Sequence, residues 1–165
     1  MSFCPFGSEP QINIEKEGMG EAYRVAYVRI EDWSDRSMDA RVARRDTPDL
    51  WEEFEVPQGE RIFQPRGDLP KVDSSEIAVI LVPGLAFSSD GSRLGRGAGF
   101  YDRFLCAHPS ALRVGVAWGE QILPEIPVSG HDERVDIILT EQSLVTTNSY
   151  GEWRIHGKIK SRNQP

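Results

Sequence analysis

The feature that most constrains the fold of this chain is the stretch from residue 79 to residue 102, VILVPGLAFSSDGSRLGRGAGFYD. It begins with an apolar, largely β-branched run over residues 79–82, which stops at Pro83 and Gly84. A loop with glycines at 91, 95, 97 and 99 follows, and no helix breaker then occurs before Pro109. This order predicts a buried strand over residues 77–82, a glycine-rich loop and a helix over residues 101–107.

The chemistry of this loop favours a bound anion. Glycine has no Cβ, so such a loop adopts positive φ angles and brings backbone N–H groups close to a ligand. Arg93 and Arg96 add guanidinium groups that match phosphate oxygens in pairs. Asp102 either caps the helix or holds Mg²⁺, which takes only one or two protein oxygens beside a polyphosphate. The spacing G-x-G-x-G differs from the dinucleotide fingerprint, no G-K-[ST] follows, and a ligand-free connection remains the competing interpretation.

Composition narrows the class of protein. With 165 residues, 39% of them apolar, the chain suits one compact domain. The formal charge of −7 argues against a nucleic-acid partner, although Arg93 and Arg96 suffice for a small nucleotide. Cys4 and Cys106 form no metal-binding or disulfide pattern, so we expect both to be buried thiols in a reducing compartment. Without a signal peptide or an apolar run of about 20 residues, we expect a cytoplasmic protein with no membrane partner.

The remaining patterns predict an α/β protein. We expect further strands over residues 3–6, 24–30, 38–44, 113–117 and 135–140, with the arginines of 38–44 on a solvated edge. Helices are predicted over residues 11–20 and 48–54, and residues 57–76 form a loop with at most one short strand. Buried strands separated by such connections indicate an open, mostly parallel, Rossmann-like sheet with helices on both faces. This domain spans residues 1–144, and residues 145–165 form a polar, basic tail.

Three strand exits are predicted to meet at one ligand site. In an open α/β sheet, ligands bind at the carboxyl ends of the strands, so residues 7–9, 83–102 and 118–121 converge. Trp118 either stacks on a flat ligand or packs in the core, and Gln121 offers a hydrogen-bonding amide. His131 precedes the last predicted strand, and without a nucleophile nearby in sequence we assign it a structural or ligand-edge role.

The block PGLAFSSDGSRLGRGAGFYDR, residues 83–103, resembles the signature of the 5-formyltetrahydrofolate cyclo-ligase family, also called 5,10-methenyltetrahydrofolate synthetase. It joins the strand exit, the R-L-G-R-G-x-G core and the aromatic-Tyr-Asp end without interruption. Residues 5–10, 119–121, 123–124 and 131–136 are similar to other blocks of the family, so the resemblance covers about residues 3 to 141.

This resemblance implies the ATP- and Mg²⁺-dependent cyclisation of 5-formyltetrahydrofolate to 5,10-methenyltetrahydrofolate, with ADP and phosphate as the other products. The residues implied to bind ATP are Arg93, Leu94, Gly95, Arg96, Gly97, Ala98, Gly99, Phe100, Tyr101 and Asp102. Among these, Asp102 holds Mg²⁺, and Arg96 and Tyr101 take part in catalysis. The residues implied to bind the reduced folate are Glu9, Phe63, Tyr101, Trp118 and Gln121.

Two departures from the family pattern keep an alternative open. The basic helical segment that precedes the first strand in the family is missing before Phe3, and Phe100 replaces the first tyrosine of the Tyr-Tyr-Asp end. The alternative is a non-catalytic relative that binds a folate or a nucleotide, or one whose site a partner subunit completes. A basic tail that folds back would supply the missing cations. We expect a monomer, with a dimer as the second possibility.

Overall fold

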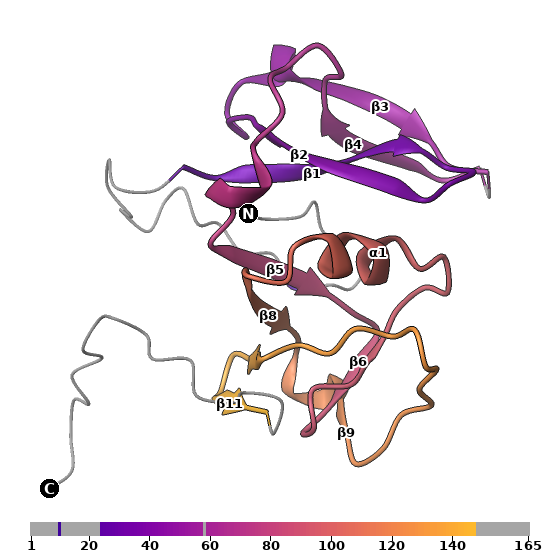
Figure 1. The fold of residues 1–165 in the computed structure, drawn as a ribbon, viewed down its shortest axis with the longest axis vertical. Coiled ribbons are helices and arrows are strands. Elements are labelled where there is room, and N and C mark those ends of the chain that lie inside the picture. The colour runs from indigo at the N-terminus through magenta and orange to yellow at the C-terminus, as the bar shows by residue number, and fades with distance from the viewer. Residues whose placement is uncertain (1–9, 11–23, 58, 148–165) are drawn as a thin grey trace, which may run out of the picture.

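The structure, a computed structural model, describes residues 10, 24–57 and 59–147 (Figure 1). This part of the chain contains four small sheets and one α-helix, α1 (Phe100–Ala107). Its strands are β1 (Ala26–Asp32), β2 (Ser37–Val42), β3 (Trp51–Glu55), β4 (Arg61–Pro65), β5 (Val79–Pro83), β6 (Ala86–Ser88), β7 (Arg93–Leu94), β8 (Leu112–Val116), β9 (Ile122–Leu123), β10 (Ile137–Leu139) and β11 (Leu144–Thr146). Its 3₁₀ helices are Pro48–Leu50, Ser74–Glu76 and Gly119–Gln121.

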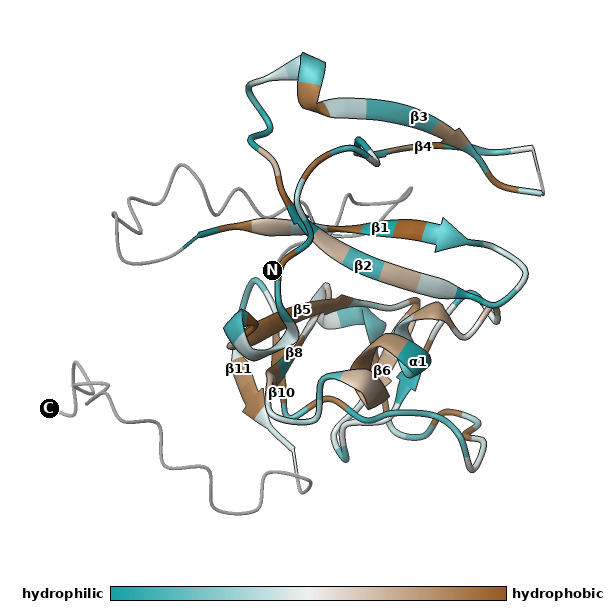
Figure 2. Cartoon of the chain, turned by 45° about the horizontal axis from the view of Figure 1, so that its top comes forward, coloured by the Kyte–Doolittle hydropathy of each residue, from teal (hydrophilic) through white to brown (hydrophobic). Residues whose placement is uncertain are grey.

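The predicted parallel sheet is confirmed in its central strands. Strands β5, β8 and β10 are parallel neighbours, and β11 adds an antiparallel edge that the sequence did not predict. Ile80, Val82 and Ile138 are fully buried, and β5 is apolar along its whole length in Figure 2. The α/β class is therefore correct, whereas helices on both faces of the sheet stay a prediction, because the described residues include only α1.

Two antiparallel hairpins, β1–β2 and β3–β4, lie to one side of the central sheet and of α1 (Figures 1 and 2). The backbone N–H of Ile30 in β1 donates to Oε1 of Gln64 in β4 at 3.1 Å, which links the hairpins. Arg41 in β2 is only 4% exposed and pairs with Glu31 and Asp39. The expectation that all the arginines of this strand are solvated is therefore wrong for Arg41, because these two carboxylates neutralise it.

The predicted helix over residues 48–54 is also wrong. Only Pro48–Leu50 forms a helical turn, of 3₁₀ type, and β3 begins at Trp51. Strand β3 pairs along its full length with β4, and Trp51 packs edge-on against Tyr27 with ring centroids 5.0 Å apart. Pairing with β4 decides the structure here, because a run of five residues is too short for its apolar pattern to distinguish a helix from a strand. Strand β4 is the one short strand expected within residues 57–76.

The first half of the glycine-rich stretch is a hairpin rather than an open loop. Strands β6 and β7 pair antiparallel, and β9 joins β6 in parallel. Asp90 holds the hairpin turn by accepting hydrogen bonds from the hydroxyl of Ser88 at 2.5 Å and the backbone N–H of Ser92 at 3.0 Å. Gly91 has a φ of +88°, and a Cβ there would lie 2.4 Å from the backbone oxygen of Val135. The loop between β7 and α1 is therefore limited to residues 95–99.

Two further expectations concern the ends of the chain and its thiols. Cys106 is exposed, so its predicted burial is wrong; Phe104 and Leu105 are buried, while Cys106 faces outward. Strand β11 and buried Thr147 extend the packed part of the chain beyond residue 145, and the basic tail otherwise lies outside the described residues. The predictions for residues 3–6, Glu9 and 11–20 also fall outside them. None of the described helices has the length and apolar character needed to span a membrane.

Candidate active site

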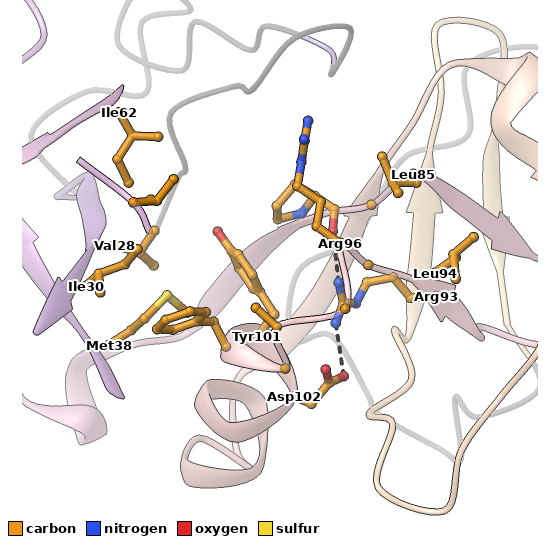
Figure 3. A pocket seen from close by; sticks show the side chains of 18 of the residues that line it. Val28, Ile30, Met38, Ile62, Leu85, Arg93, Leu94, Arg96, Tyr101 and Asp102 are labelled. Carbon is orange, nitrogen blue, oxygen red and sulfur yellow. Dashed lines mark hydrogen bonds and ion pairs between the residues drawn. The ribbon is translucent and has the colours of Figure 1, made fainter. Parts of the chain in front are cut away.

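One cavity of about 550 Å³ lies between the hairpins on one side and the glycine-rich loop and the start of α1 on the other (Figure 3). Its apolar wall comes from β1, β2 and β4, and the side chains that form it are Val28, Ile30, Met38, Ile62 and Phe63. The opposite wall is the continuous segment from Arg93 to Asp102. The cavity thus has an apolar side and a side rich in backbone N–H groups and arginine, a combination that suits a ligand with a flat ring system and an anionic group.

The loop at residues 95–99 has the geometry of an anion cradle. Gly97 and Gly99 have φ angles of +85° and +72°, which favour glycine. A Cβ at Gly97 would meet no atom of the described chain within 4 Å, so this part of the loop is open. Gly99 caps the N-terminus of α1, where backbone N–H groups without helical partners attract negative charge. These features fit a phosphate group at Gly97 and Gly99.

Arg93 lines the cavity, but its guanidinium group is hydrogen-bonded to other groups of the protein. Its side chain is 6% exposed, and Nη2 donates to Oδ1 of Asp102 at 2.9 Å (Figure 3). Nη1 lies 3.4 Å from the backbone oxygen of Pro83, and a Cβ at Gly95 would lie 2.7 Å from the same nitrogen. A side chain at Gly95 would therefore have to displace the end of the Arg93 guanidinium, which passes directly beneath it. The predicted contact between Arg93 and phosphate stays a prediction, and the guanidinium contacts seen here hold the loop in place.

Asp102 lies in the first turn of α1 and is 19% exposed. Oδ1 accepts both from Arg93 and from the backbone N–H of Glu133 at 3.2 Å, so the two hydrogen bonds use one oxygen. No group of three acidic, histidine or cysteine side chains within the described ranges is arranged to hold a metal by itself. One carboxylate oxygen still fits Mg²⁺, which in phosphate sites takes most of its ligands from phosphate and water.

The two aromatic residues before Asp102 have different surroundings. Tyr101 lines the cavity with its hydroxyl directed between the apolar wall and Arg96 (Figure 3), and the Arg93 guanidinium lies 5.7 Å from its ring centroid. Phe100 is buried and packs against Trp33 with ring centroids 4.9 Å apart. Both residues line the cavity, and Phe100 in addition anchors α1 to the tip of the first hairpin through Trp33.

That hairpin tip brings a residue to the loop that sequence reasoning missed. Arg36 has a φ of +59°, and its Nη1 lies 3.6 Å from the position that a Cβ on Gly99 would occupy. The tip is fixed by a hydrogen bond of 2.8 Å from Nη1 of Arg103 to the backbone oxygen of Asp35. No sequence signal pointed to Arg36, because only the packing of the hairpin on α1 brings the two segments together. Arg36 thus adds a positive charge beside Gly99, and exposed Arg96 adds another within the loop itself.

The predicted folate-binding residues are only partly brought together. Phe63 lines the cavity and is 58% exposed, whereas Trp118 and Gln121 are absent from the described residues that line it. The Gln121 amide donates to the backbone oxygens of Gly84 and Leu85, at 3.1 Å each, and accepts from the N–H of Trp118 at 2.7 Å. Gln121 therefore supports residues 84–85, which line the cavity. His131 is exposed outside the cavity, and Glu9 lies outside the described residues.

The sequence model of the 5-formyltetrahydrofolate cyclo-ligase family matches residues 18–141. The chain belongs to this family. The 5-formyltetrahydrofolate cyclo-ligase of Mus musculus is 41% identical over 90 residues, which are 50% of this chain and 44% of that protein. The enzyme of the same name from Mycolicibacterium smegmatis is 47% identical over 73 residues, or 44% of this chain and 38% of that protein. The matched part thus spans less than half the length of these two cyclo-ligases.

The fold is also similar to a solved structure. The NMR structure of Aquifex aeolicus 5,10-methenyltetrahydrofolate synthetase superposes with a TM-score of 0.70, at 24% sequence identity. The superposition covers 94% of this chain and 74% of the synthetase. At this identity the likeness supports the cyclo-ligase fold, and the roles of individual residues must be argued from their own geometry.

Proposed function

We propose that this cyclo-ligase family member converts 5-formyltetrahydrofolate and ATP into 5,10-methenyltetrahydrofolate, ADP and phosphate. The observation that carries the proposal is the single cavity that joins the R-L-G-R-G-x-G loop to an apolar wall from two hairpins. A phosphoryl transfer between two bound substrates requires that an anion cradle and a ring-binding surface face each other within reach. Family membership supports the same reaction.

In this proposal, the two walls of the cavity bind different substrates. The backbone of residues 94–99 holds the terminal phosphates, with Arg96 from the loop and Arg36 beside Gly99 as the neighbouring cations. The reduced folate lies against Val28, Ile30 and Met38, with Phe63 at the open edge and the ring of Tyr101 beside its reacting end. Glu9, Trp118 and Gln121 stay predictions as folate ligands, and Gln121 would act through residues 84–85.

The proposed reaction transfers a phosphoryl group and then closes a ring. The formyl oxygen forms a bond to the γ-phosphorus as the bond to ADP breaks. The neighbouring folate nitrogen then attacks the formyl carbon and loses its proton, and the former formyl oxygen leaves with phosphate. Such a reaction needs positioning and charge neutralisation more than a general base. Arg96 neutralises the transferring group, and Tyr101 orients the formyl group beside it.

Mg²⁺ bound to the phosphates would neutralise their charge, and Asp102 is the residue proposed to hold it. Oδ1 of Asp102 already accepts from Arg93 and Glu133, which fixes the carboxylate in one orientation. That orientation positions the carboxylate at the end of the loop that would bind the phosphates.

The Arg93–Asp102 ion pair favours one second candidate, a relative that binds the ligands without turnover. Both residues are predicted ligands of ATP or Mg²⁺, and in this structure they neutralise each other. Purified protein mixed with 5-formyltetrahydrofolate and MgATP distinguishes the two functions. The near-ultraviolet absorbance of the methenyl product should grow only when ATP and Mg²⁺ are both present. Folate or ATP binding detected by calorimetry without that absorbance would favour the binding protein. If neither ligand binds, both candidate functions are contradicted.

A further inference from the structure

Gln64 is a buried amide whose orientation is fixed by the backbone of a neighbouring strand. It lies in β4, and its side chain is 2% exposed. Oε1 accepts the backbone N–H of Ile30 in β1 at 3.1 Å. Because that N–H requires an acceptor, the amide oxygen must be directed toward β1, and flipping the amide would place two donors against each other. The NH₂ group is therefore held away from Ile30.

That NH₂ group has no hydrogen-bond acceptor in the part of the chain that the structure describes. A buried donor without an acceptor costs free energy, so such groups are rare and often mark positions where another molecule supplies the partner. Replacing the amide by an apolar side chain would remove this cost. The arrangement thus suggests that the donor is retained for binding rather than for stability.

Gln64 also lines the cavity. Every other residue of β1, β2 and β4 that lines it is apolar, and these are Val28, Ile30, Met38, Ile62 and Phe63. Nε2 itself is shielded from solvent, so a ligand acceptor that reached it would form a strong hydrogen bond for which water does not compete. It also discriminates sharply, because a ligand without an acceptor at that point leaves the donor unpaired.

We propose that Nε2 of Gln64 donates a hydrogen bond to a carbonyl oxygen of the reduced folate, and that this contact selects the ligand. The proposal rests on the proposed function, since it takes a reduced folate as the occupant of the cavity. The pterin ring carbonyl and the formyl group both offer the required acceptor. An ionised carboxylate at position 64 would keep the bond from Ile30 but lose the donor, which makes glutamate a sharp probe.

The test compares the full-length wild type with Gln64→Glu and Gln64→Met, using calorimetric dissociation constants for 5-formyltetrahydrofolate and for 5-methyltetrahydrofolate, which lacks the formyl oxygen. Gln142→Glu, the same change at an exposed position, is the matched control. Both Gln64 variants should weaken folate binding by at least about tenfold, the loss expected for one buried hydrogen bond. The control should bind as the wild type does. Urea unfolding identifies the conditions under which each variant is folded.

Each outcome bears on a different claim. Equal losses for the two folates would support the proposal with the ring carbonyl as acceptor, and a loss confined to 5-formyltetrahydrofolate would support it with the formyl oxygen. If both folded Gln64 variants bind with wild-type affinity, Gln64 only joins β1 to β4 and the proposal is overturned while the proposed function stands. If the wild type binds neither folate, the proposed function fails, and this inference fails with it.

Discussion

Nη2 of Arg93 donates to Oδ1 of Asp102 at 2.9 Å, so the two ends of the glycine-rich loop are joined by an ion pair. Arg93 lies in β7, before the loop, and Asp102 lies in the first turn of α1, after it. Arg93 also passes beneath Gly95, where a Cβ would lie 2.7 Å from Nη1. The pair therefore fixes the span that residues 95–99 must cross, which pre-organises the cradle without filling it.

Asp102→Asn and Asp102→Ala should separate the metal role of this carboxylate from its structural role. Asparagine keeps an acceptor for Arg93 and Glu133, so we expect a stability loss of about 1 kcal/mol and loss of Mg²⁺-dependent turnover. Alanine removes the carboxylate that neutralises the buried guanidinium of Arg93, so this variant should also lose Mg²⁺-dependent turnover, and its free energy of unfolding should fall by about 3 kcal/mol. Urea unfolding and product formation at several Mg²⁺ concentrations measure the two effects. Full Mg²⁺-dependent activity in the asparagine variant would remove the metal assignment.

Arg36→Ala should weaken ATP binding. Nη1 of Arg36 lies beside Gly99, and a hydrogen bond from a charged donor to phosphate contributes about 1.5–3 kcal/mol, or roughly tenfold or more in the dissociation constant. The effect should be larger at low ionic strength, because Arg36 is exposed and salt screens it. Arg61→Ala, which removes an exposed arginine of the second hairpin, is the control. Equal ATP affinities for the two variants at low salt would show that Arg36 does not contact the nucleotide.

These residues show where prediction from sequence succeeds and where it fails. The strand over residues 77–82, the helix that follows it and the positive φ angles of the loop glycines were predictable, because their signals lie within one continuous stretch. The helix predicted over 48–54 failed because β3 is stabilised by pairing with β4, which comes later in the chain. Arg36 and Gln64 were missed for the same reason, since Arg36 approaches Gly99, and Gln64 bonds to Ile30, only when segments distant in the sequence pack together.

Acid should reveal the contribution of the β6–β7 turn to stability. Hydrogen bonds from the Ser88 hydroxyl, and then from the Ser92 backbone, lower the pKa of Asp90 from 3.8 to about 2. In acid the unfolded state therefore binds a proton before the folded state does, so stability decreases as the pH falls through this interval. Asp90→Asn should be less stable than the wild type at pH 7, and the difference should shrink below pH 3.8 and be small near pH 2. Urea midpoints measured across this range would show a constant difference if Asp90 did not titrate in this way.

Gly97→Ala should mainly lower ATP affinity and Gly91→Ala should mainly lower stability, although both residues have positive φ angles. A Cβ at Gly97 meets no described atom within 4 Å, so alanine there costs only the backbone strain of about 1–2 kcal/mol. It places a methyl group where the phosphate is proposed to lie, and ATP binding should fall sharply. A Cβ at Gly91 would lie 2.4 Å from the Val135 backbone oxygen, so that variant should lose more stability. Its folded fraction should bind ATP as the wild type does, because Gly91 lies in the hairpin turn rather than in the cradle. Thermal unfolding and calorimetry on both proteins test this contrast, and unchanged ATP affinity in Gly97→Ala would exclude the loop as the phosphate site.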